Sequence, residues 1–329
     1  MNLINYSIKD FENLFNQIFD GKIHKNDIKD FLLNLNKANL PQNSFIAAIN
    51  SLKKRMKRIN SPLGAIDVCG TGGDKLNTLN ISTAVSFVIA GCGVCVAKHG
   101  NKAISSNSGS ADIFQELGIK IYDEEPIIEK ILQEKGLCFL FAPLFHQSLK
   151  HVAIARKELG VATIFNFLGP LLNPANTKYQ LIGTSNKGSM IKLAKVIAKE
   201  QSEHGQDSQV FIVHGYDGMD EITLSDNSCL VRCCNGQIND EENINPQDFG
   251  FNKINIKEII GKDPKYNAQK LIELLQGAKS SYRNIVILNA AYALIAAKKI
   301  DKINLAIEMA QDAIDSNRAF SILQSLRQS

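Results

Sequence analysis

The 329-residue chain has balanced charge and an ordinary apolar content. It carries 37 basic and 33 acidic residues, a net charge of +4, and is 44% hydrophobic and 21% charged. These values exclude a disordered chain and a collagen-like fibre, and so small a net charge does not favour a dedicated nucleic-acid-binding protein. At about 150 residues per domain, the length predicts roughly two domains.

No targeting or membrane-spanning segment is expected. The opening sequence MNLINYSIKDFENLF lacks the basic and apolar regions of a signal peptide. The longest apolar run, 285–297, is shorter than the roughly 20 residues needed to cross a bilayer, contains Asn289 and Tyr292, and predicts a buried helix.

Seven cysteines, an odd number, favour reduced thiols and a cytoplasmic location. The CGVC sequence at 92–95 has no second pair, which favours buried structural thiols over a redox or zinc site.

Residues 1–60 predict successive helices. Apolar side chains recur at spacings of three and four, which is typical of an amphipathic helix: Phe11, Leu14, Phe15, Ile18 and Phe19. The segments 27–33 and 41–56 continue the pattern, which ends at Ser61-Pro62. The basic run at 53–58 is interpreted as a solvated helix face, with a phosphate or nucleic-acid surface as the alternative.

From residue 65 onward, short apolar runs alternate with helical stretches. The runs at 65–69, 94–97, 137–142, 179–182 and 210–213 predict strands, and the stretches at 82–91, 109–117, 126–135, 147–159 and 187–200 predict helices. The segments 221–224 and 229–232 predict a hairpin, and three helical stretches follow Pro264. The expected fold class is α/β, with a small all-helical part and a larger α/β domain that has a mostly parallel central sheet.

The first polar cluster, 67–83, follows a predicted strand and opens a predicted helix. Its sequence DVCGTGGD, followed by TLNIST, is rich in glycine, which lets backbone N–H groups surround an anion beside a helix N-terminus. It lacks the Gly-Lys-Ser/Thr of a P-loop and the third glycine of a dinucleotide fingerprint. A glycine-rich turn without a ligand remains the alternative for this stretch taken alone.

The second polar cluster, 98–112, follows the next predicted strand. It contains KHGNK and SSNSGSAD, so Lys98 offers a positive charge to a phosphate and the serines offer hydroxyl donors. His99 is equally compatible with a structural role. Because ligands of open α/β sheets lie beyond the carboxyl ends of the strands, both clusters are expected to face one crevice.

The third polar cluster, 213–221, has the sequence VHGYDGMDE and again follows an apolar strand. Its last two residues, Asp220 and Glu221, are adjacent carboxylates. Mg²⁺ prefers oxygen ligands and often shares them with substrate phosphates. A solvated turn is the alternative for the acidic pair alone, whereas a phosphate-binding loop combined with this pair predicts a Mg²⁺-bound polyphosphate substrate.

Together, the three clusters resemble the anthranilate phosphoribosyltransferase family, which belongs to the nucleoside phosphorylase-like phosphoribosyltransferases. Residues 70–74 and 78–83 are similar to that family's first loop for 5-phosphoribosyl 1-pyrophosphate, and residues 98–101 and 108–112 to its second. Further matches follow in family order between 142 and 175, and at 214–221, 263–268 and 288–291.

The resemblance implies transfer of the phosphoribosyl group to the amine of anthranilate, giving N-(5-phosphoribosyl)anthranilate and pyrophosphate, in tryptophan biosynthesis. It also implies a helical domain of residues 1–66, joined by a returning segment near 160–180, and an α/β domain of residues 67–329. A homodimer formed largely through the helical domain is expected. The other implied partners are the two small-molecule substrates, with neither nucleic acid nor a membrane.

The matching positions also imply the site residues. Phosphoribosyl pyrophosphate is expected at Gly70, Gly73, Asp74, Thr78, Asn80, Ile81, Ser82, Thr83, Lys98, Ser106 and Ser110. Anthranilate is expected at Gly70, Asn101, His146, Arg156 and Gly169. Two Mg²⁺ ions per subunit are expected at Ser82, Asp220 and Glu221. No residue is assigned as an acid, base or nucleophile, because the implied catalysis is electrostatic and positional.

Three positions depart from the family pattern. Ala162 and Lys102 stand where arginine is usual, and Lys75 stands where glycine is common. Ala162 removes a positive charge near the joint between the expected domains. Lys102 keeps a charge but loses the planar guanidinium fork.

Two other functions are considered beside the transferase. A pyrimidine nucleoside phosphorylase shares the fold and a KHG-type loop, and a relative that binds nucleic acid would keep the fold alone. Neither function needs the carboxylate pair Asp220 and Glu221, and the second would need a strongly basic surface, so the transferase is preferred.

Overall fold

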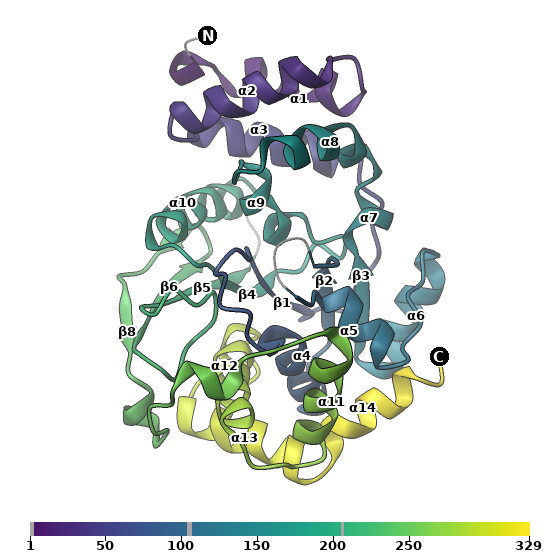
Figure 1. Ribbon diagram of the computed structural model, residues 1–329, viewed down its shortest axis with the longest axis vertical. Coiled ribbons are helices and arrows are strands. Elements are labelled where there is room, and N and C mark those ends of the chain that lie inside the picture. Colours follow the sequence, from purple (N-terminus) through teal and green to yellow (C-terminus); the bar gives the residue numbers. More distant parts are fainter. Residues whose placement is uncertain (1–2, 104–106, 205–206) are drawn as a thin grey trace.

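The computed structural model describes residues 3–103, 107–204 and 207–329 (Figure 1). A short 3₁₀ turn, η1 (Leu3–Asn5), precedes three helices, α1 (Ile8–Phe19), α2 (Lys25–Lys37) and α3 (Gln42–Lys53). α1 begins with a capping box, in which the Asp10 amide donates to Ser7 Oγ at 3.2 Å and the Ser7 amide donates to Asp10 at 2.9 Å. The apolar face predicted for α1 is buried.

A later part of the chain returns to these three helices. α7 (Ala142–Phe145) and η2 (Gln147–Leu149) lead into α8 (Lys150–Leu159), which packs on α1 and α2. α9 (Phe165–Leu168) and η3 (Gly169–Leu172) follow. The ring of Phe165 lies edge-on to Phe15 and Phe19, at 6.3 and 6.1 Å between centroids. Aromatic burial therefore joins two segments far apart in sequence at the top of Figure 1.

The sheet has the order β3-β2-β1-β4-β5-β6-β7, with β8 also paired to β6. Its strands are β1 (Ile66–Gly70), β2 (Val96–Gly100), β3 (Leu137–Phe141), β4 (Tyr179–Gly183), β5 (Gln209–Gly215), β6 (Ser228–Cys234), β7 (Gln237–Ile238) and β8 (Glu242–Ile244). β1 to β5 are parallel, and β6 to β8 are antiparallel. The expected α/β class with a mostly parallel sheet is confirmed.

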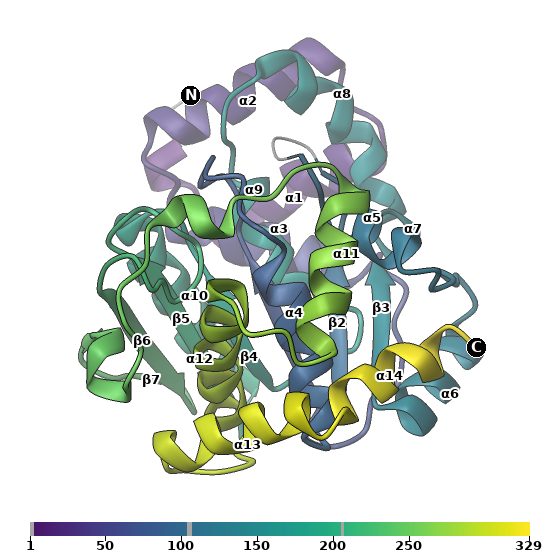
Figure 2. The same ribbon diagram turned by 60° about the horizontal axis from the view of Figure 1, so that its bottom comes forward.

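Helices cover both faces of the sheet. One face packs on α4 (Ile81–Gly91) and on the C-terminal helices, which lie in front in Figure 2. These helices are α11 (Pro264–Leu275), α12 (Ser281–Ala296), α13 (Ile303–Asp315) and α14 (Arg318–Leu326). The other face packs on α10 (Lys187–His204) and α6 (Glu125–Lys135). The remaining elements are α5 (Ser110–Glu116), η4 (Pro246–Phe249) and η5 (Ile256–Ile259).

Three details differ from the sequence predictions. β2 begins at Val96, two residues late, and four helices rather than three follow residue 263. The hairpin prediction is wrong, because 221–224 is not a strand and β6 pairs with β5, β7 and β8 instead. The run 285–297 does lie within a buried helix, α12. Across the described ranges, no helix is both long and apolar enough to cross a membrane.

Candidate functional site

The candidate site lies at the carboxyl edge of the parallel strands. β1 lies between β2 and β4, so the chain runs outward in both directions from β1. Ligands of open α/β sheets bind in the crevice at such a reversal of strand order. The loops after β1, β2, β4 and β5 all leave the sheet at this edge, and they contain the three polar clusters.

The loop after β1 is hydrogen-bonded to the acidic loop after β5. The Gly72 amide donates to Asp220 Oδ2 at 2.9 Å, and the Ser82 amide donates to Glu221 Oε1 at 3.1 Å. Gly70 permits this approach, because a Cβ there would overlap the Asp220 carboxylate. The structure thus brings together Gly70, Ser82, Asp220 and Glu221, which are far apart in the sequence.

Asp220 and Glu221, where the loops after β1 and β5 meet, lie in an environment that favours a cation. Burial, followed by the nearby charge of Asp74, raises the pKa of Asp220. Burial and the charge of Asp220 raise the pKa of Glu221 well above its ordinary value, and Lys98 offsets part of this effect. Negative charges held close together out of water repel one another, so a positive ligand between them would be stabilised.

Lys98 lies beneath the first loop. Its side chain is 1% exposed, and Nζ donates to the Val68 carbonyl at 2.7 Å and to Ser82 Oγ at 3.4 Å. Burial lowers the pKa of this amine, and the charge of the buried Asp67 acts in the opposite direction. The Lys98 amine therefore lies between β1 and the first turn of α4, where it supplies positive charge.

The rest of the first loop contacts α11, the segment before it and the second cluster. Thr78 forms a single bridge to Ile260, and the Asn80 amide group donates to the Ser108 carbonyl at 3.1 Å and accepts from Asn267 at 3.0 Å. Asn267 is buried. These contacts fix the half-buried side chain of Asn80, which connects the loops after β1 and β2. These are the two candidate phosphate-binding loops.

The remaining residues of the first cluster differ in exposure. Ile81 and Thr83 are buried in the first turn of α4, whereas Gly73 is exposed and has φ of +86°. The Asp74 side chain accepts the Leu76 amide at 3.2 Å. Lys75, at the position where the family pattern has glycine, adopts φ of +61°, a left-handed conformation that glycine takes with less strain.

The described residues on either side of 104–106 in the second cluster are joined through Asp112 of α5. Asp112 accepts the amides of Ala103 at 3.0 Å and Gly109 at 2.9 Å. Ser110 Oγ donates to the Asn101 carbonyl at 3.4 Å, while the Asn101 side chain is exposed. Ser106, expected to bind phosphoribosyl pyrophosphate, lies outside the described residues.

His99 of the second cluster contacts His146 and the Gly169 carbonyl. The rings of His99 and His146 lie 5.2 Å apart, and His99 Nδ1 is 3.2 Å from the Gly169 carbonyl. Burial lowers the pKa of His99 to about 3 and that of His146 to about 4. In the described part of the chain, His99 Nε2 has no hydrogen-bond partner. The backbone of Leu172 offsets part of the effect of burial on the pKa of His146.

Arg156 projects from α8 over the ring of Phe165, 5.4 Å from its centre. Among the described residues, no carboxylate lies within 4.0 Å of its guanidinium. Burial lowers the pKa of this group. A partly buried guanidinium without an anionic partner is suited to bind a carboxylate from outside the chain.

Three residues that shape this site have no role predicted from the sequence. Gly183 ends β4 against the Asp220 carbonyl, Asn267 holds Asn80, and Asn289 holds the backbone after Glu221. A polar residue inside the apolar run of α12 was the available signal for Asn289. The other two positions depend on contacts between loops, which no local pattern reports.

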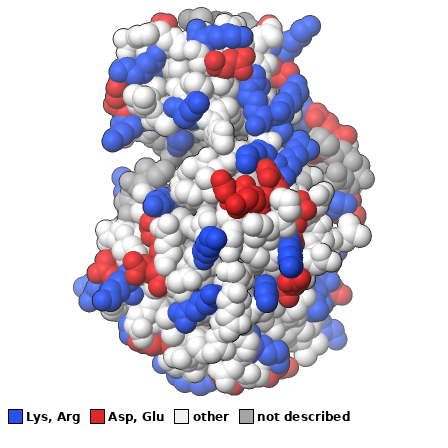
Figure 3. All heavy atoms as spheres, turned by 90° about the vertical axis from the view of Figure 1, so that its right-hand side faces the viewer, with Lys and Arg blue, Asp and Glu red and all other residues white. Residues whose placement is uncertain are grey.

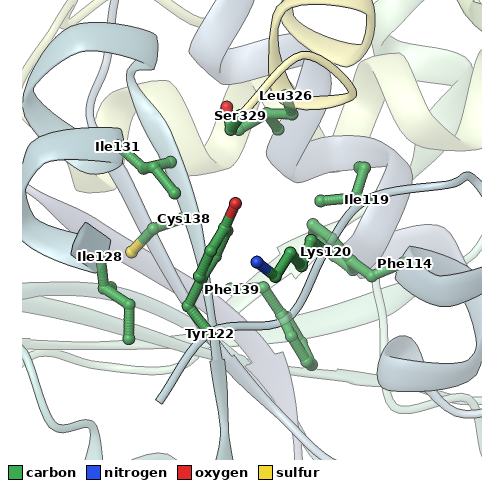
Figure 4. A pocket seen from close by; sticks show the side chains of 10 residues that line it. All are labelled: Phe114, Ile119, Lys120, Tyr122, Ile128, Ile131, Cys138, Phe139, Leu326 and Ser329. Carbon is green, nitrogen blue, oxygen red and sulfur yellow. The ribbon is translucent and has the colours of Figure 1, made fainter. Parts of the chain in front are cut away.

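A small apolar cavity lies elsewhere, between β3, α6 and the C-terminal helix (Figure 4). Phe114, Ile119 and Leu326 line it, and Lys120 is its one charged side chain, 4.5 Å from the centre of the Tyr122 ring. No residue of the candidate site lines this cavity. Its walls are mostly apolar and it lies apart from the three polar clusters, so we do not assign it to the substrate.

The basic run at 53–58 makes ion pairs within the protein. Lys53 pairs with Glu200 at 2.9 Å and Arg55 with Asp20 at 2.7 Å, while Lys57 lies 3.4 Å from Glu125. Figure 3 shows basic side chains lying beside acidic ones over the face that it presents. The local charge of the run is therefore largely compensated.

The chain matches a protein family model and many proteins over most of its length. Residues 63–320 match the model described as glycosyl transferase family, a/b domain. Among curated relatives, anthranilate phosphoribosyltransferase of Petrotoga mobilis is 39% identical over 98% of this chain and 92% of its own length. The enzyme of the same name from Methylocella silvestris is 39% identical over 95% of this chain and 88% of its own.

Solved structures agree with these relatives. The anthranilate phosphoribosyltransferase of Thermus thermophilus superposes with a TM-score of 0.91 at 26% identity, over all of both chains. The Saccharomyces cerevisiae enzyme, in complex with PRPP and Mg, gives a TM-score of 0.88 at 26% identity, over 98% of this chain and 93% of that one. With the three loops in place at one sheet edge, the chain belongs to the anthranilate phosphoribosyltransferase family of pentosyl-transferring enzymes.

Proposed function

We propose that this chain transfers the phosphoribosyl group of 5-phosphoribosyl 1-pyrophosphate to the amine of anthranilate. The products are N-(5-phosphoribosyl)anthranilate and pyrophosphate, and the reaction is a step of tryptophan biosynthesis. The observation that carries the proposal is the joint between the glycine-rich loop after β1 and the carboxylates after β5. At the reversal of strand order, backbone amides suited to bind an anion lie beside two carboxylates suited to bind a cation.

The side chains at this joint fit Mg²⁺. Asp220 and Glu221 offer oxygen ligands, and the repulsion that raises the pKa of both groups is the kind that a divalent cation relieves. Among the described residues, no group of three or more His, Cys, Asp or Glu side chains is arranged around one metal position. That agrees with Mg²⁺ held by one or two carboxylates and completed by water and substrate phosphates.

We assign Ser82, Asp220 and Glu221 as the residues that hold Mg²⁺, with two ions per subunit. Bound there, Mg²⁺ neutralises negative charge on the departing pyrophosphate. The backbone amides of the first loop and the N-terminus of α4 bind phosphate oxygens. Phosphoribosyl pyrophosphate lies along Gly70–Asp74, Thr78–Thr83 and the second loop, with the Lys98 amine supplying positive charge from below.

Group transfer needs no covalent intermediate with the protein. The anthranilate nitrogen attacks C1 of the ribosyl group, the C1–oxygen bond breaks, and its electron pair leaves with pyrophosphate. The amine then loses a proton. The ribosyl centre carries positive charge in the transition state, as in glycosyl transfer generally. The chain accelerates this step by holding the amine and the sugar in line and by stabilising the leaving group.

We place anthranilate between the second loop and the returning segment. Arg156 binds its carboxylate, because this guanidinium has no anionic partner of its own among the described residues. His146 and Gly169 line the path with Asn101 and Gly70, and the His146 ring lies 5.2 Å from that of His99. Ala162 offers only its carbonyl here, which accepts the Asn36 amide at 2.8 Å.

We further propose a homodimer formed through a helical domain of residues 1–66 and the returning segment near 160–180, beside an α/β domain of residues 67–329. Apolar side chains exposed on or near these helices support this surface: Ile4, Leu33, Ile154 and Val161. Light scattering should give twice the mass of one chain. A cytoplasmic location agrees with seven unbonded thiols.

The proposed reaction is tested by following the fluorescence of anthranilate. We expect the purified protein to consume it when phosphoribosyl pyrophosphate and Mg²⁺ are both present. Omitting either one should stop the consumption. A folded protein that leaves anthranilate unchanged under these conditions would contradict the proposal.

A further inference from the structure

Asn289 is a fully buried polar residue in the middle of the apolar helix α12. Its side chain is 0% exposed and makes three hydrogen bonds. A buried amide in an apolar helix costs free energy unless every polar atom has a partner. The hydrogen-bond partners of Asn289 therefore indicate its structural role.

Two of these three bonds join the helix to the acidic loop. The Ile222 amide donates to Asn289 Oδ1 at 2.9 Å, and Nδ2 donates to the Ile222 carbonyl at 2.8 Å. The third bond, from Nδ2 to the Ile285 carbonyl at 2.9 Å, fixes the side chain against its own helix. The amide group thus satisfies both backbone groups of Ile222, as a neighbouring strand would.

Ile222 directly follows Glu221, so this contact lies immediately behind the carboxylate pair. The next backbone amide, that of Thr223, donates to Ser228 Oγ at 3.0 Å. Ser228 begins β6, the strand that directly follows the acidic loop, so this bond is local. Asn289 instead connects the loop to a helix that packs on α4. α4 in turn offers the Ser82 amide to Glu221.

We propose that Asn289 is a positioning residue, which fixes the backbone behind Asp220 and Glu221 so that both carboxylates face the Mg²⁺–phosphoribosyl pyrophosphate complex. The inference rests on the proposed function. It assigns to Asn289 no contact with substrate or metal. Loss of its amide leaves two buried backbone groups of the loop without partners, which favours loop conformations that expose them.

The test compares Asn289→Ala and Asn289→Leu with Leu323→Ala. Leucine has the branched shape of asparagine and is somewhat larger, so this variant removes the hydrogen bonds without leaving a cavity. Leu323 is fully buried on α14, away from the loop, and its loss reproduces a general destabilisation of the core. Binding of phosphoribosyl pyrophosphate with Mg²⁺ is measured by calorimetry without anthranilate, and steady-state kinetics are measured separately.

We expect both Asn289 variants to weaken calorimetric binding by about tenfold or more and to raise the Mg²⁺ concentration for half-maximal rate by a similar factor. The KM for anthranilate should stay unchanged, because Arg156 and the second loop are untouched. Leu323→Ala should leave all three values near those of the wild type. Asn289 variants that behave like Leu323→Ala would overturn the inference, as would an equal change in both substrate constants. A wild-type protein that binds no phosphoribosyl pyrophosphate would instead contradict the proposed function.

Discussion

At the scale of single residues, the site depends on a few charges placed where water is scarce. Asp220 accepts the Gly72 amide and Glu221 accepts the Ser82 amide, and the Asp74 carboxyl lies beside Asp220. Arg156 is the positive group that we propose for the carboxylate of the acceptor. The residue types of Asp220 and Glu221 pointed to a metal site directly, whereas Arg156 was implied only by the family resemblance. The sequence could not show that Lys98 lies under the loop, since burial depends on how distant segments pack.

The double variant Asp220→Asn, Glu221→Gln tests the acidic pair. Both amides keep the shape of the side chains and remove the charges that we propose hold Mg²⁺. We expect turnover to fall by about 10³-fold or more, because neutralising the leaving group is worth several kcal/mol. The fold should persist, since the variant relieves a buried repulsion. Asp226→Asn, in the same loop and paired with Lys253 at 3.6 Å, is the control and should remain active. Normal Mg²⁺-dependent turnover in the double variant would refute the metal assignment.

Replacing Arg156 by alanine tests the acceptor site. A charged hydrogen bond to a carboxylate contributes roughly 1.5–3 kcal/mol, so the KM for anthranilate should rise about 10- to 100-fold. The KM for phosphoribosyl pyrophosphate should change little. Lys157→Ala removes the neighbouring exposed charge on α8 and is the matched control. An unchanged KM for anthranilate in Arg156→Ala would remove this residue from the acceptor site.

At the scale of elements, local patterns predicted the strands and helices better than the loops between them. The parallel strands and α4 follow from apolar runs and turn residues. The segment 221–224 has strand-like composition but forms no strand. Its backbone is hydrogen-bonded to the side chains of Asn289 and Ser228 rather than to another strand. A contact across 67 residues decides the conformation, so the local sequence could not.

Gly183 shows how closely these elements approach one another. It ends β4, and a Cβ added there would overlap the Asp220 carbonyl oxygen. We expect Gly183→Ala to displace the acidic loop and to lower kcat/KM by about 10²-fold, the effect of misplacing catalytic groups by about 1 Å. Gly188→Ala is the control, because a Cβ there meets only the end of the Asn186 side chain. Equal kinetics for the two variants would show that the loop tolerates the displacement.

At the scale of the whole molecule, the helical part and the sheet are not separate bodies. One apolar cluster joins Phe11 and Phe45 of the N-terminal helices to Ile182 and Ile212 of the sheet, with α10 between them. The change of pattern near residue 65 predicted two regions. It could not predict their shared core, because each segment's apolar face is equally compatible with several partners. His99 and His146 lie where the returning segment meets the strand ends.

These two histidines predict a pH dependence of the free energy of unfolding. Burial lowers the pKa of His99 to about 3 and that of His146 to about 4, whereas an unfolded histidine titrates near about 6.5. Between these values the unfolded chain binds more protons, so the pair's contribution is complete above about pH 6.5 and is lost as the pH falls. Each ring should contribute a slope of about 1.4 kcal/mol per pH unit.

Asp220 and Glu221, whose pKa values are raised, titrate in the opposite sense. The measurement is therefore a difference between the wild type and His99→Asn, His146→Asn, by urea unfolding at pH 7 and pH 5. At pH 5 the wild type should have lost about 2 kcal/mol per histidine that the double variant does not lose. His24→Asn, at an exposed helix N-cap that asparagine also suits, should follow the wild type. An equal loss of stability on acidification in the double variant and the wild type would contradict this prediction. It would show that protonation of His99 and His146 does not cause the loss.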